Sequence, residues 1–315
     1  MPFVYDIPLT ARFRGIARRR GLVFQGEAGW AEFSPFEDYP AAAAVPWWRA
    51  AREAADLGFP PPVRSAVEVN ATIPALPPAQ AARLVRRCGA QTAKVKVAEP
   101  GQTASQEADR LAAVRDALGA SGRIRIDANG AWDRATAVDR IAALDRAAGG
   151  LEYVEQPCAE VADLAWVRRR VKPPIAADES IRLAADPLEV KSRAAADIAV
   201  LKVQPLGGVR ACLRLAEALD LPAVVSSAIE TSLGLAMGVA LAAALPRLDH
   251  ACGLGTLPLL SGDLVADSPF LADAVIPVCA AVPSLALLQR WAAPEPLRAA
   301  WERRLGEVGE LAMAR

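Results

Sequence analysis

Short apolar runs alternate with longer helical patterns along most of the chain. We interpret the apolar runs as strands, at residues 67–70, 92–97, 123–127, 151–155, 175–178, 198–203, 223–227 and about 250–254. Apolar residues recur with helical spacing between several of them, at 104–118, 134–147, 163–171, 209–219 and 233–244. Eight strands alternating with helices predict an α/β fold with a parallel sheet, and this number favours a closed (β/α)8-type barrel. An open doubly wound sheet is the alternative, but it would normally show a glycine-rich turn after its first strand.

The two ends of the chain have a different pattern. Residues 4–16 and 22–33 resemble strands around a basic turn, 40–57 resembles a helix, and "GFPPPVR" at 58–64 resembles a linker. The region after 261 is rich in loops and ends in a predicted helix at 297–315. We therefore expect an α+β domain over 1–64, a barrel domain over 65–260, and a carboxyl-terminal segment, 261–315, that packs back towards the first domain.

The composition is that of an ordinary soluble globular protein. The chain has 315 residues, of which 53% are hydrophobic and 23% charged, and its formal net charge is zero. Nothing in this charge favours a nucleic-acid partner, and the apolar run 233–245 is too short to span a bilayer, so we expect no membrane partner. We see no signal peptide, and the five scattered cysteines, without a CxxC pair, favour reduced thiols in a cytoplasm.

Lysine is scarce in this chain, and its positions are informative. Only five of the 36 basic residues are lysines, and three of them, Lys94, Lys96 and Lys202, lie in apolar strand-like runs. A buried lysine amine can act as a base, whereas arginine keeps its proton. The arginine run 18–20 is expected to be solvated surface. The single histidine, His250, is placed at the start of a strand and is expected to be structural, which disfavours a Ser-His-Asp triad or a multi-histidine metal site.

Ionisable residues occur at the ends of five successive predicted strands. In a (β/α)8 barrel the catalytic groups lie at the carboxyl ends of the strands. Those ends carry, in order, Lys96, Asp127, Glu155, Asp178 and Lys202. Each uncompensated charge in a barrel interior would cost several kcal/mol, so chance placement is a poor explanation. Three carboxylates form an oxygen-rich site that Mg²⁺ prefers, and lysines on either side suggest removal of a proton next to a substrate carboxylate.

Taken together, these motifs resemble those of the enolase superfamily, in its muconate lactonizing enzyme subgroup. The resemblance covers nearly the whole chain, and the motifs are Lys94-Val-Lys96, Asp127-Ala-Asn129, Glu155-Gln-Pro157, Asp178-Glu179-Ser180 and Lys202. It implies a modified (β/α)8 barrel with an α+β capping domain. It also implies lysine-based proton abstraction assisted by a metal ion.

The resemblance assigns a role to each of these residues. Asp127, Glu155 and Asp178 would bind Mg²⁺, with Mn²⁺ able to substitute. Lys96 would be the base, Lys94 would modulate it and help to neutralise a substrate carboxylate, and Lys202 would act from the opposite side. Asn129 and Glu179 would support the metal ligands from behind.

Within the superfamily, the sequence is most similar to the o-succinylbenzoate synthase family. The supporting stretches are "FRG", "AGWAEFSPF", "VNATIPA", "VVSSAIETSLGLA" and "CGLGTLPLL". This resemblance implies syn elimination of water from 2-succinyl-6-hydroxy-2,4-cyclohexadiene-1-carboxylate, a small-molecule carboxylate, in menaquinone biosynthesis. The mandelate racemase subgroup is disfavoured, because Ala228 and its neighbours supply no histidine at the seventh strand end.

Several contacts and two other functions stay open at this point. Ser226 and Ser227 are candidate contacts to the succinyl group or plain polar strand ends. Gly253 and Gly255 could offer backbone N–H groups to a carboxylate or serve only the turn. The capping loop with Phe13 and Arg14 is a further candidate contact. An N-acylamino acid racemase or dipeptide epimerase would use the same lysines and metal, and a non-catalytic binding barrel is a more distant alternative.

Overall fold

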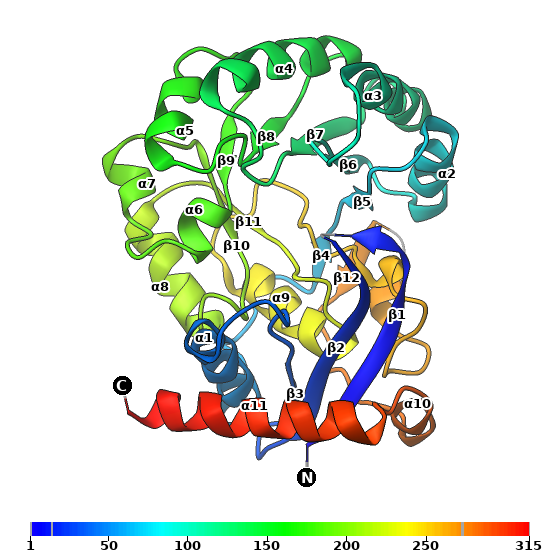
Figure 1. Cartoon of the computed structure of the whole chain (residues 1–315), viewed down its shortest axis with the longest axis vertical. Coiled ribbons are helices and arrows are strands. Elements are labelled where there is room, and N and C mark those ends of the chain that lie inside the picture. Colours follow the sequence, from blue (N-terminus) through cyan, green and yellow to red (C-terminus); the bar gives the residue numbers. More distant parts are fainter. Residues whose placement is uncertain (1, 14, 272–273, 315) are drawn as a thin grey trace.

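A parallel sheet curls around the centre of one half of the computed structural model, which describes residues 2–13, 15–271 and 274–314 (Figure 1). Its seven strands follow one another in chain order from β5 to β11. They are β5 (Ala71–Ile73), β6 (Thr92–Lys96), β7 (Arg123–Asp127), β8 (Tyr153–Glu155), β9 (Ile175–Ala177), β10 (Ile198–Leu201) and β11 (Ala223–Val225). The predicted α/β barrel architecture is confirmed in this respect.

The two edges of this sheet are joined through Cys252 and Gly253. Gly253 pairs with Ser226 beyond β11, and Cys252 pairs with Val69 ahead of β5. The Cys252 amide donates to Glu68 O at 2.7 Å, and the Gly253 amide donates to Val225 O at 2.8 Å. The predicted eighth strand at 250–254 is therefore wrong as a strand: it contributes only these bridges, although it does close the ring.

The predicted first barrel strand at 67–70 is also misplaced. Residues Ala66–Glu68 form β4, which pairs antiparallel with β12 (Val275–Pro277) in a separate two-stranded sheet. The chain joins the barrel only afterwards, in β5, which is parallel to β6. The single predicted strand is thus divided between two sheets: the chain pairs with β12 up to Glu68 and with β6 from Ala71 onwards.

Helices cover the outside of the curled sheet (Figure 1). They are α2 (Pro78–Cys88), α3 (Ala104–Leu118), α4 (Arg134–Ala147), α5 (Val161–Arg168), α6 (Glu179–Arg182), α7 (Glu189–Ser192) and α8 (Val209–Leu219). Two of them begin at residues that satisfy the first backbone N–H groups. Thr103 and Gln106 form a reciprocal capping box on α3, and Asp133 accepts from two amides at the start of α4.

Strand periodicity decides which side chains enter the barrel. Alternate residues of a strand share one face. Tyr153, Ala176, Ile198, Val200 and Val224 form an apolar cluster from β8 to β11. Continuing the same alternation by two residues gives Glu155 after Tyr153, Asp178 after Ala176 and Lys202 after Val200. The charged groups therefore form a layer directly above an apolar one.

The amino-terminal part is an antiparallel sheet of three strands, where two were expected. These are β1 (Phe3–Phe13), β2 (Ile16–Gln25) and β3 (Trp30–Phe33), followed by α1 (Ala41–Arg52) and a π-helical turn η1 (Glu53–Leu57). The arginine run 18–20 lies within β2 and forms no turn. Arg18 and Arg20 pair with Asp6, but Arg19 is only 2% exposed, so the expectation of a solvated run is wrong for Arg19.

The carboxyl-terminal segment runs along the amino-terminal sheet. It contains η2 (Leu257–Leu259), η3 (Pro269–Leu271), α10 (Leu285–Arg290) and α11 (Glu295–Met313). Helix α11 packs against α1, and its buried Trp301 meets the ring of Phe33 edge-on at 6.3 Å. Figure 1 shows α11 crossing the end of the molecule near the amino terminus. The domain limits at 64 and 260 stay a prediction.

Helix α9 (Ser232–Ala244) connects the two parts of the molecule. It packs against β3 of the amino-terminal sheet and against β11 and β4. Twelve of its 13 residues are buried, as the continuous apolar composition predicted. No helix in the described part of the chain combines the length and apolarity needed to cross a bilayer.

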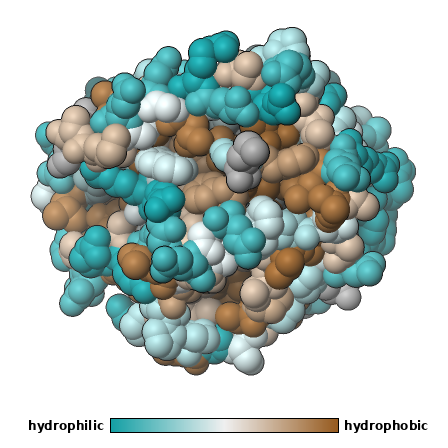
Figure 2. All heavy atoms as spheres, turned by 90° about the horizontal axis from the view of Figure 1, so that it is seen from below, coloured by the Kyte–Doolittle hydropathy of each residue, from teal (hydrophilic) through white to brown (hydrophobic). Residues whose placement is uncertain are grey.

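The face that α11 crosses is mixed in character. Figure 2 shows apolar patches interrupted by polar side chains on this side of the molecule. Large apolar residues that are well exposed include Leu57 and Val63 before the barrel and Val282 and Leu285 in the carboxyl-terminal segment. Single exposed apolar residues of this kind are normal on a globular protein.

A polar cluster lies below the apolar layer of the barrel. Arg125 donates to Glu152 Oε2 at 2.5 Å, and its guanidinium carbon lies 4.6 Å from the centre of the Tyr153 ring. His250 Nδ1 lies 3.0 Å from Glu152 Oε1, at the opposite end of the strands from the charged layer. His250 is thus a structural partner, as expected. Burial acts to raise the pKa of Glu152, but hydrogen bonds from His250 and Arg125 outweigh it and lower the pKa to about 2.

Glu152→Gln should reduce stability near neutral pH and have less effect in acid. The folded-state pKa of Glu152 lies below its ordinary value of 4.5, so its contribution is present above pH 4.5 and is lost as the pH falls towards 2. We expect a difference of about 1–2 kcal/mol at pH 6, after allowance for solvent screening. Urea unfolding of both proteins between pH 6 and pH 3 measures it. A gap that stays constant over this range would contradict the assignment.

Candidate active site

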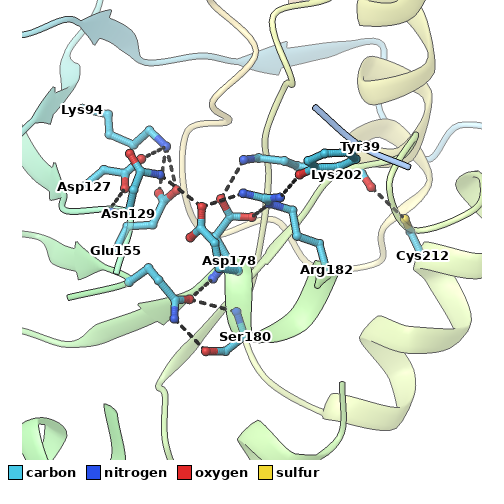
Figure 3. A network of polar contacts seen from close by, with 12 residues as sticks. Tyr39, Lys94, Asp127, Asn129, Glu155, Asp178, Ser180, Arg182, Lys202 and Cys212 are labelled. Atoms are coloured by element: carbon cyan, nitrogen blue, oxygen red, sulfur yellow. Dashed lines mark hydrogen bonds and ion pairs between the residues drawn. The ribbon is translucent and has the colours of Figure 1, made fainter. Parts of the chain in front are cut away.

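Lys94 extends from β6 to the carboxylates that end the next two strands (Figure 3). Lys96, two residues later, contacts the first of these carboxylates, Asp127. The Lys94 amine donates to Glu155 Oε1 at 2.8 Å, to Glu155 Oε2 at 2.9 Å and to Asp127 Oδ2 at 3.1 Å. The Lys96 amine donates to Asp127 Oδ2 at 2.6 Å and also to Asn129 Oδ1. Both lysines are buried, and β6 lies between β5 and β7. These lysines are therefore not the solvated face of an edge strand.

The charges in this part of the site act strongly on one another. Burial raises the pKa of Glu155, and the neighbouring Asp127 raises it further, to about 7, although Lys94 opposes both effects. Burial acts on Asp127 in the same direction, but Lys96 and Lys94 outweigh it and hold the Asp127 pKa well below its usual range. Burial would lower the pKa of Lys94, yet Glu155 and Asp127 raise it well above its ordinary value. Lys94 is thus held as an ammonium group.

Asp178 receives two cations from the other side of the site. Lys202 Nζ donates to Asp178 Oδ2 at 2.6 Å, and Arg182 Nε donates to Asp178 Oδ1 at 2.9 Å. Burial would raise the Asp178 pKa, but Lys202 and Arg182 outweigh it and lower the pKa to about 2. Arg182 also donates to Glu179 Oε1 at 2.5 Å and to Tyr39 Oη at 2.8 Å. Arg182 therefore ties the barrel carboxylates to the amino-terminal domain.

Asn129 contacts Asp127 directly, and Glu179 contacts Asn129 and Arg182; their support of metal ligands stays a prediction. The Asn129 amide donates to Asp127 Oδ1 at 3.1 Å, and its side-chain nitrogen donates to Glu179 Oε1 at 3.1 Å. Asn129 has φ 47°, a left-handed conformation that asparagine tolerates better than most residues. It turns the chain sharply after β7 and so brings its amide back onto Asp127.

Three further residues hold the site in place and were not singled out from the sequence. Gln156 Oε1 accepts the backbone amides of Asp178 and Ser180 at 2.9 and 3.1 Å, which fixes the start of α6 against the end of β8. Arg182 stands four residues after Asp178, a helical spacing that was readable in the sequence. No sequence signal connects Tyr39 with this site, because the contact joins positions 143 residues apart.

A small cavity opens onto these groups from the capping side. Its barrel wall includes Lys96, Asn129, Arg182, Lys202, Pro205, Ser227, Ala228 and Ile229, and its other wall is formed by Phe36 and Trp47. The two lysines come from strands that lie four places apart in the sheet order, so they face the cavity from different sides. With a volume of about 40 Å³ it has room for only a few water molecules, so a larger ligand must displace the side chains that line it.

The structure brings Ser227 to this cavity but does not place Ser226 in its lining. The Ser227 hydroxyl lies 2.6 Å from Thr256 Oγ1 and accepts the Ile229 amide at 2.8 Å. Ser227 therefore shapes the loop after β11, whether or not it also touches a substrate. A role of either serine in substrate binding stays a prediction.

Gly253 and Gly255 are not among the residues that line the cavity. A Cβ on Gly253 would come within 2.6 Å of Ser226 Oγ, and one on Gly255 within 2.6 Å of Asn70 O. Close packing at the closure of the barrel is a sufficient reason for both glycines. Their proposed contact with a carboxylate stays a prediction.

The predicted capping-loop contacts fall at the edge of what the structure describes. Phe13 is the last residue of β1, and Arg14 lies outside the described residues. A contact of either residue with substrate therefore stays a prediction.

The donor set of the cluster fits a hard divalent cation. Asp127, Glu155 and Asp178 are at most 1% exposed, and oxygen ligands of this kind suit Mg²⁺. Glu179 pairs with Arg182 through Oε1, but its Oε2 is buried without a hydrogen-bond partner in the described ranges, so this oxygen can still accept. Over the same ranges, no group of three or more carboxylate, imidazole or thiol side chains has the arrangement of a metal site. Lysine amines occupy the carboxylate oxygens instead: Lys94 lies between Asp127 and Glu155, and Lys202 contacts Asp178.

Comparison with known families gives matches to both parts of the chain. The family described as "Enolase N-terminal domain-like" matches residues 4–55, and the family described as "Enolase C-terminal domain-like" matches residues 78–283. The second match covers β6 to β11 of the curled sheet and the helices from α2 onwards, but not β5.

Curated relatives are similar over nearly the full length. The chain is 60% identical to the o-succinylbenzoate synthase of Thermobifida fusca over 302 residues, which are 96% of this chain and 93% of that protein. It is 49% identical to the o-succinylbenzoate synthase of Mycobacterium tuberculosis over 300 residues, which are 95% of this chain and 90% of that protein.

Solved structures show the same fold at low identity. The L-Ala-D/L-Glu epimerase of Bacillus subtilis has a TM-score of 0.76 at 22% identity, over 90% of this chain and 96% of that chain. The muconate lactonizing enzyme of Pseudomonas putida has a TM-score of 0.75 at 19% identity, over 93% of this chain and 98% of that chain. The fold, the motifs and the close relatives agree: the chain belongs to the o-succinylbenzoate synthase family of the enolase superfamily.

Proposed function

We propose that this protein is an o-succinylbenzoate synthase, which eliminates water from 2-succinyl-6-hydroxy-2,4-cyclohexadiene-1-carboxylate in menaquinone biosynthesis. One observation carries the proposal: Lys96 and Lys202 face one cavity from different sides, beside buried carboxylates, in a chain 60% identical to a curated synthase. A non-catalytic barrel is disfavoured because a protein that only binds would be expected to have lost at least one of the five groups Lys96, Asp127, Glu155, Asp178 and Lys202, and all five are present.

The metal requirement follows from family membership, and we propose Mg²⁺, with Mn²⁺ as a substitute. Asp127, Glu155 and Asp178 would hold it, with Asn129 and Glu179 behind them. When bound, a divalent cation supplies positive charge beside the substrate carboxylate and makes the neighbouring proton easier to remove.

The charge balance of the site suits a metal together with a dicarboxylate substrate. The cluster joins four carboxylates to four basic side chains: Asp127, Glu155, Asp178 and Glu179 with Lys94, Lys96, Arg182 and Lys202. A divalent cation and a doubly charged anion together add no net charge. Binding both therefore leaves the net charge of the buried site unchanged.

Lys96 performs the proton transfers of the elimination. Its Nζ removes the proton from the ring carbon that carries the carboxylate, and the electron pair of this C–H bond forms the new ring double bond. The hydroxyl group leaves from the adjacent carbon on the same face, and Lys96 returns the proton to it, so that water is released. Lys202 stays protonated and stabilises the negative charge that develops on the substrate carboxylate.

We expect efficient o-succinylbenzoate formation and slow or no racemisation of N-succinyl amino acids. Elimination needs one base on one face, whereas racemisation needs both lysines to exchange protons with the same carbon. The measurement pairs the synthase assay by absorbance with incubation of each N-succinyl amino acid enantiomer in D₂O, followed by optical rotation and α-deuterium content. Fast racemisation with little o-succinylbenzoate would favour the racemase instead.

We also propose a reducing, cytoplasmic location. Cys158, Cys212 and Cys252 are buried free thiols. Burial raises the pKa of the Cys212 thiol and of the Cys158 thiol, the latter to about 12, which makes both unreactive.

A further inference from the structure

Arg19 is a buried cation in the contact between the amino-terminal sheet and the barrel. It lies in β2 between Arg18 and Arg20, whose side chains pair with Asp6. Arg19 itself is 2% exposed. Its Nε donates a hydrogen bond, at 3.0 Å, to the backbone carbonyl of Ile229 in the loop after β11. A buried guanidinium needs a specific reason, because its desolvation is costly.

The two neighbours of Arg19 that matter most are both walls of the reaction cavity. Ile229 and Phe36 line that cavity. The guanidinium carbon of Arg19 lies 4.8 Å from the centre of the Phe36 ring, and its carbonyl contact is to Ile229. Arg19 is absent from the cavity lining among the described residues, so it can act on a ligand only through these two.

Ile229 has a backbone conformation that needs such support. Its φ is 64°, in the left-handed region that a residue branched at Cβ rarely adopts. Its amide donates to Ser227 Oγ at 2.8 Å and its carbonyl accepts from Arg19 at 3.0 Å. The strained backbone of Ile229 is therefore fixed by a hydrogen bond on each side, and Arg19 supplies one of the two.

The guanidinium is in turn fixed by a buried hydrogen-bond network. Ser34 Oγ accepts from Arg19 Nη2 at 2.9 Å and donates to Glu32 Oε1 at 2.6 Å. Glu32 Oε2 accepts the Thr231 amide at 3.1 Å at the start of α9, and Gln204 Oε1 accepts the Ser34 amide at 3.2 Å. The network thus joins β2 and β3 to the loops that follow β10 and β11.

We propose that Arg19 is a positioning residue that fixes Phe36 and Ile229 as two walls of the reaction cavity and thereby sets how tightly the ring of the substrate is held. This inference rests on the proposed function. Because the two walls are apolar and carry no reacting group, their loss should weaken ground-state and transition-state binding alike. Such uniform binding appears in KM and leaves kcat nearly unchanged.

The test compares Arg19→Met with Arg18→Met, a matched change one residue away at the surface. For Arg19→Met we expect KM to rise about tenfold, with kcat within about threefold of the wild type. Calorimetric titration with o-succinylbenzoate in the presence of Mg²⁺ should show a similar loss of product affinity. Arg18→Met should match the wild type in both measurements.

A double-mutant cycle separates positioning from general stability. Glycine adopts a positive φ without strain and removes the side-chain wall, so Ile229→Gly should itself raise KM severalfold. Adding Arg19→Met to Ile229→Gly should then raise KM by a smaller factor than Arg19→Met does in the wild type, because only the Phe36 wall is left for Arg19 to position. If Arg19→Met does not fold, Arg19→Lys replaces it. We then expect a smaller rise in KM, because the lysine amine can donate to the Ile229 carbonyl but cannot also reproduce the guanidinium hydrogen bonds to Ser34.

Three results would overturn the inference. One is an unchanged KM in both Arg19 variants. Another is a loss of activity that only follows the fall in folded protein, with normal product affinity in the folded fraction. The third is full additivity with Ile229→Gly. A wild-type protein that neither forms nor binds o-succinylbenzoate would instead refute the proposed function, so the two failures are distinguishable.

Discussion

Lys96→Ala should lower the rate of o-succinylbenzoate formation by about a thousandfold or more, since a positioned general base typically contributes two to four orders of magnitude. The Lys96 amine lines the cavity, whereas the neighbouring Lys94 amine, which donates to the same Asp127 oxygen, does not, so Lys94 is not placed to replace it. Lys202→Ala should cause a loss of similar size, because the developing charge on the substrate would then lack its cation.

The fold should survive Lys96→Ala, because Asp127 keeps its hydrogen bond from Lys94 at 3.1 Å. Circular dichroism and thermal unfolding verify this in parallel with the steady-state assay. Lys172→Ala serves as the control, since Lys172 is exposed and should behave as the wild type. Turnover near the wild-type level in Lys96→Ala would remove the basis of the proposed mechanism.

Chelation should abolish turnover, and added Mg²⁺ or Mn²⁺ should restore it. We expect Glu155→Gln to weaken Mn²⁺ binding by at least about a hundredfold, because changes behind the ligands of a metal site already cost ten- to a hundredfold. The amide keeps the size of the side chain but loses its negative charge. Electron paramagnetic resonance of free Mn²⁺ measures the affinity without reference to turnover.

Glu152→Gln provides the matched control for Glu155→Gln. Both glutamates lie at or next to β8, but Glu152 pairs with Arg125 in the lower polar cluster, away from the carboxylates of the site. Its Mn²⁺ affinity should equal that of the wild type. Equal Mn²⁺ affinity in the wild type and Glu155→Gln, or full activity in metal-free protein, would contradict the assignment of this carboxylate.

Local periodicity was enough to predict the charged layer of the site. Lys94 and Lys96 alternate in β6, and Asp127 and Glu155 end the next strands, so their shared face follows from strand geometry alone. The register of the sheet places Lys96 beside Asp127 and Asp127 beside Glu155, as parallel strands of similar length require. Contacts of this kind depend only on neighbours in the sequence and on one sheet.

The parts that could not be predicted depend on contacts between distant segments. The burial of Arg19 follows from a carbonyl 210 residues away, and the role of Tyr39 from an arginine 143 residues away. The run at 67–70 was misplaced for a related reason, since its partner β12 lies in the carboxyl-terminal segment. Neither hydropathy nor spacing identifies such partners.

The position of α11 has a consequence for the order in which the nascent chain can mature. Arg304 of this helix donates to the backbone carbonyls of Phe36 and Tyr39, both at 2.8 Å. Phe36 is a wall of the cavity and Tyr39 accepts from Arg182, so the segment that covers the site depends on a helix made after the whole barrel. During synthesis, β1 to β3 emerge first but must wait for residues 295–313 before their helical layer is complete. Catalytic competence should therefore appear only after the barrel has closed and α11 has docked onto the capping domain.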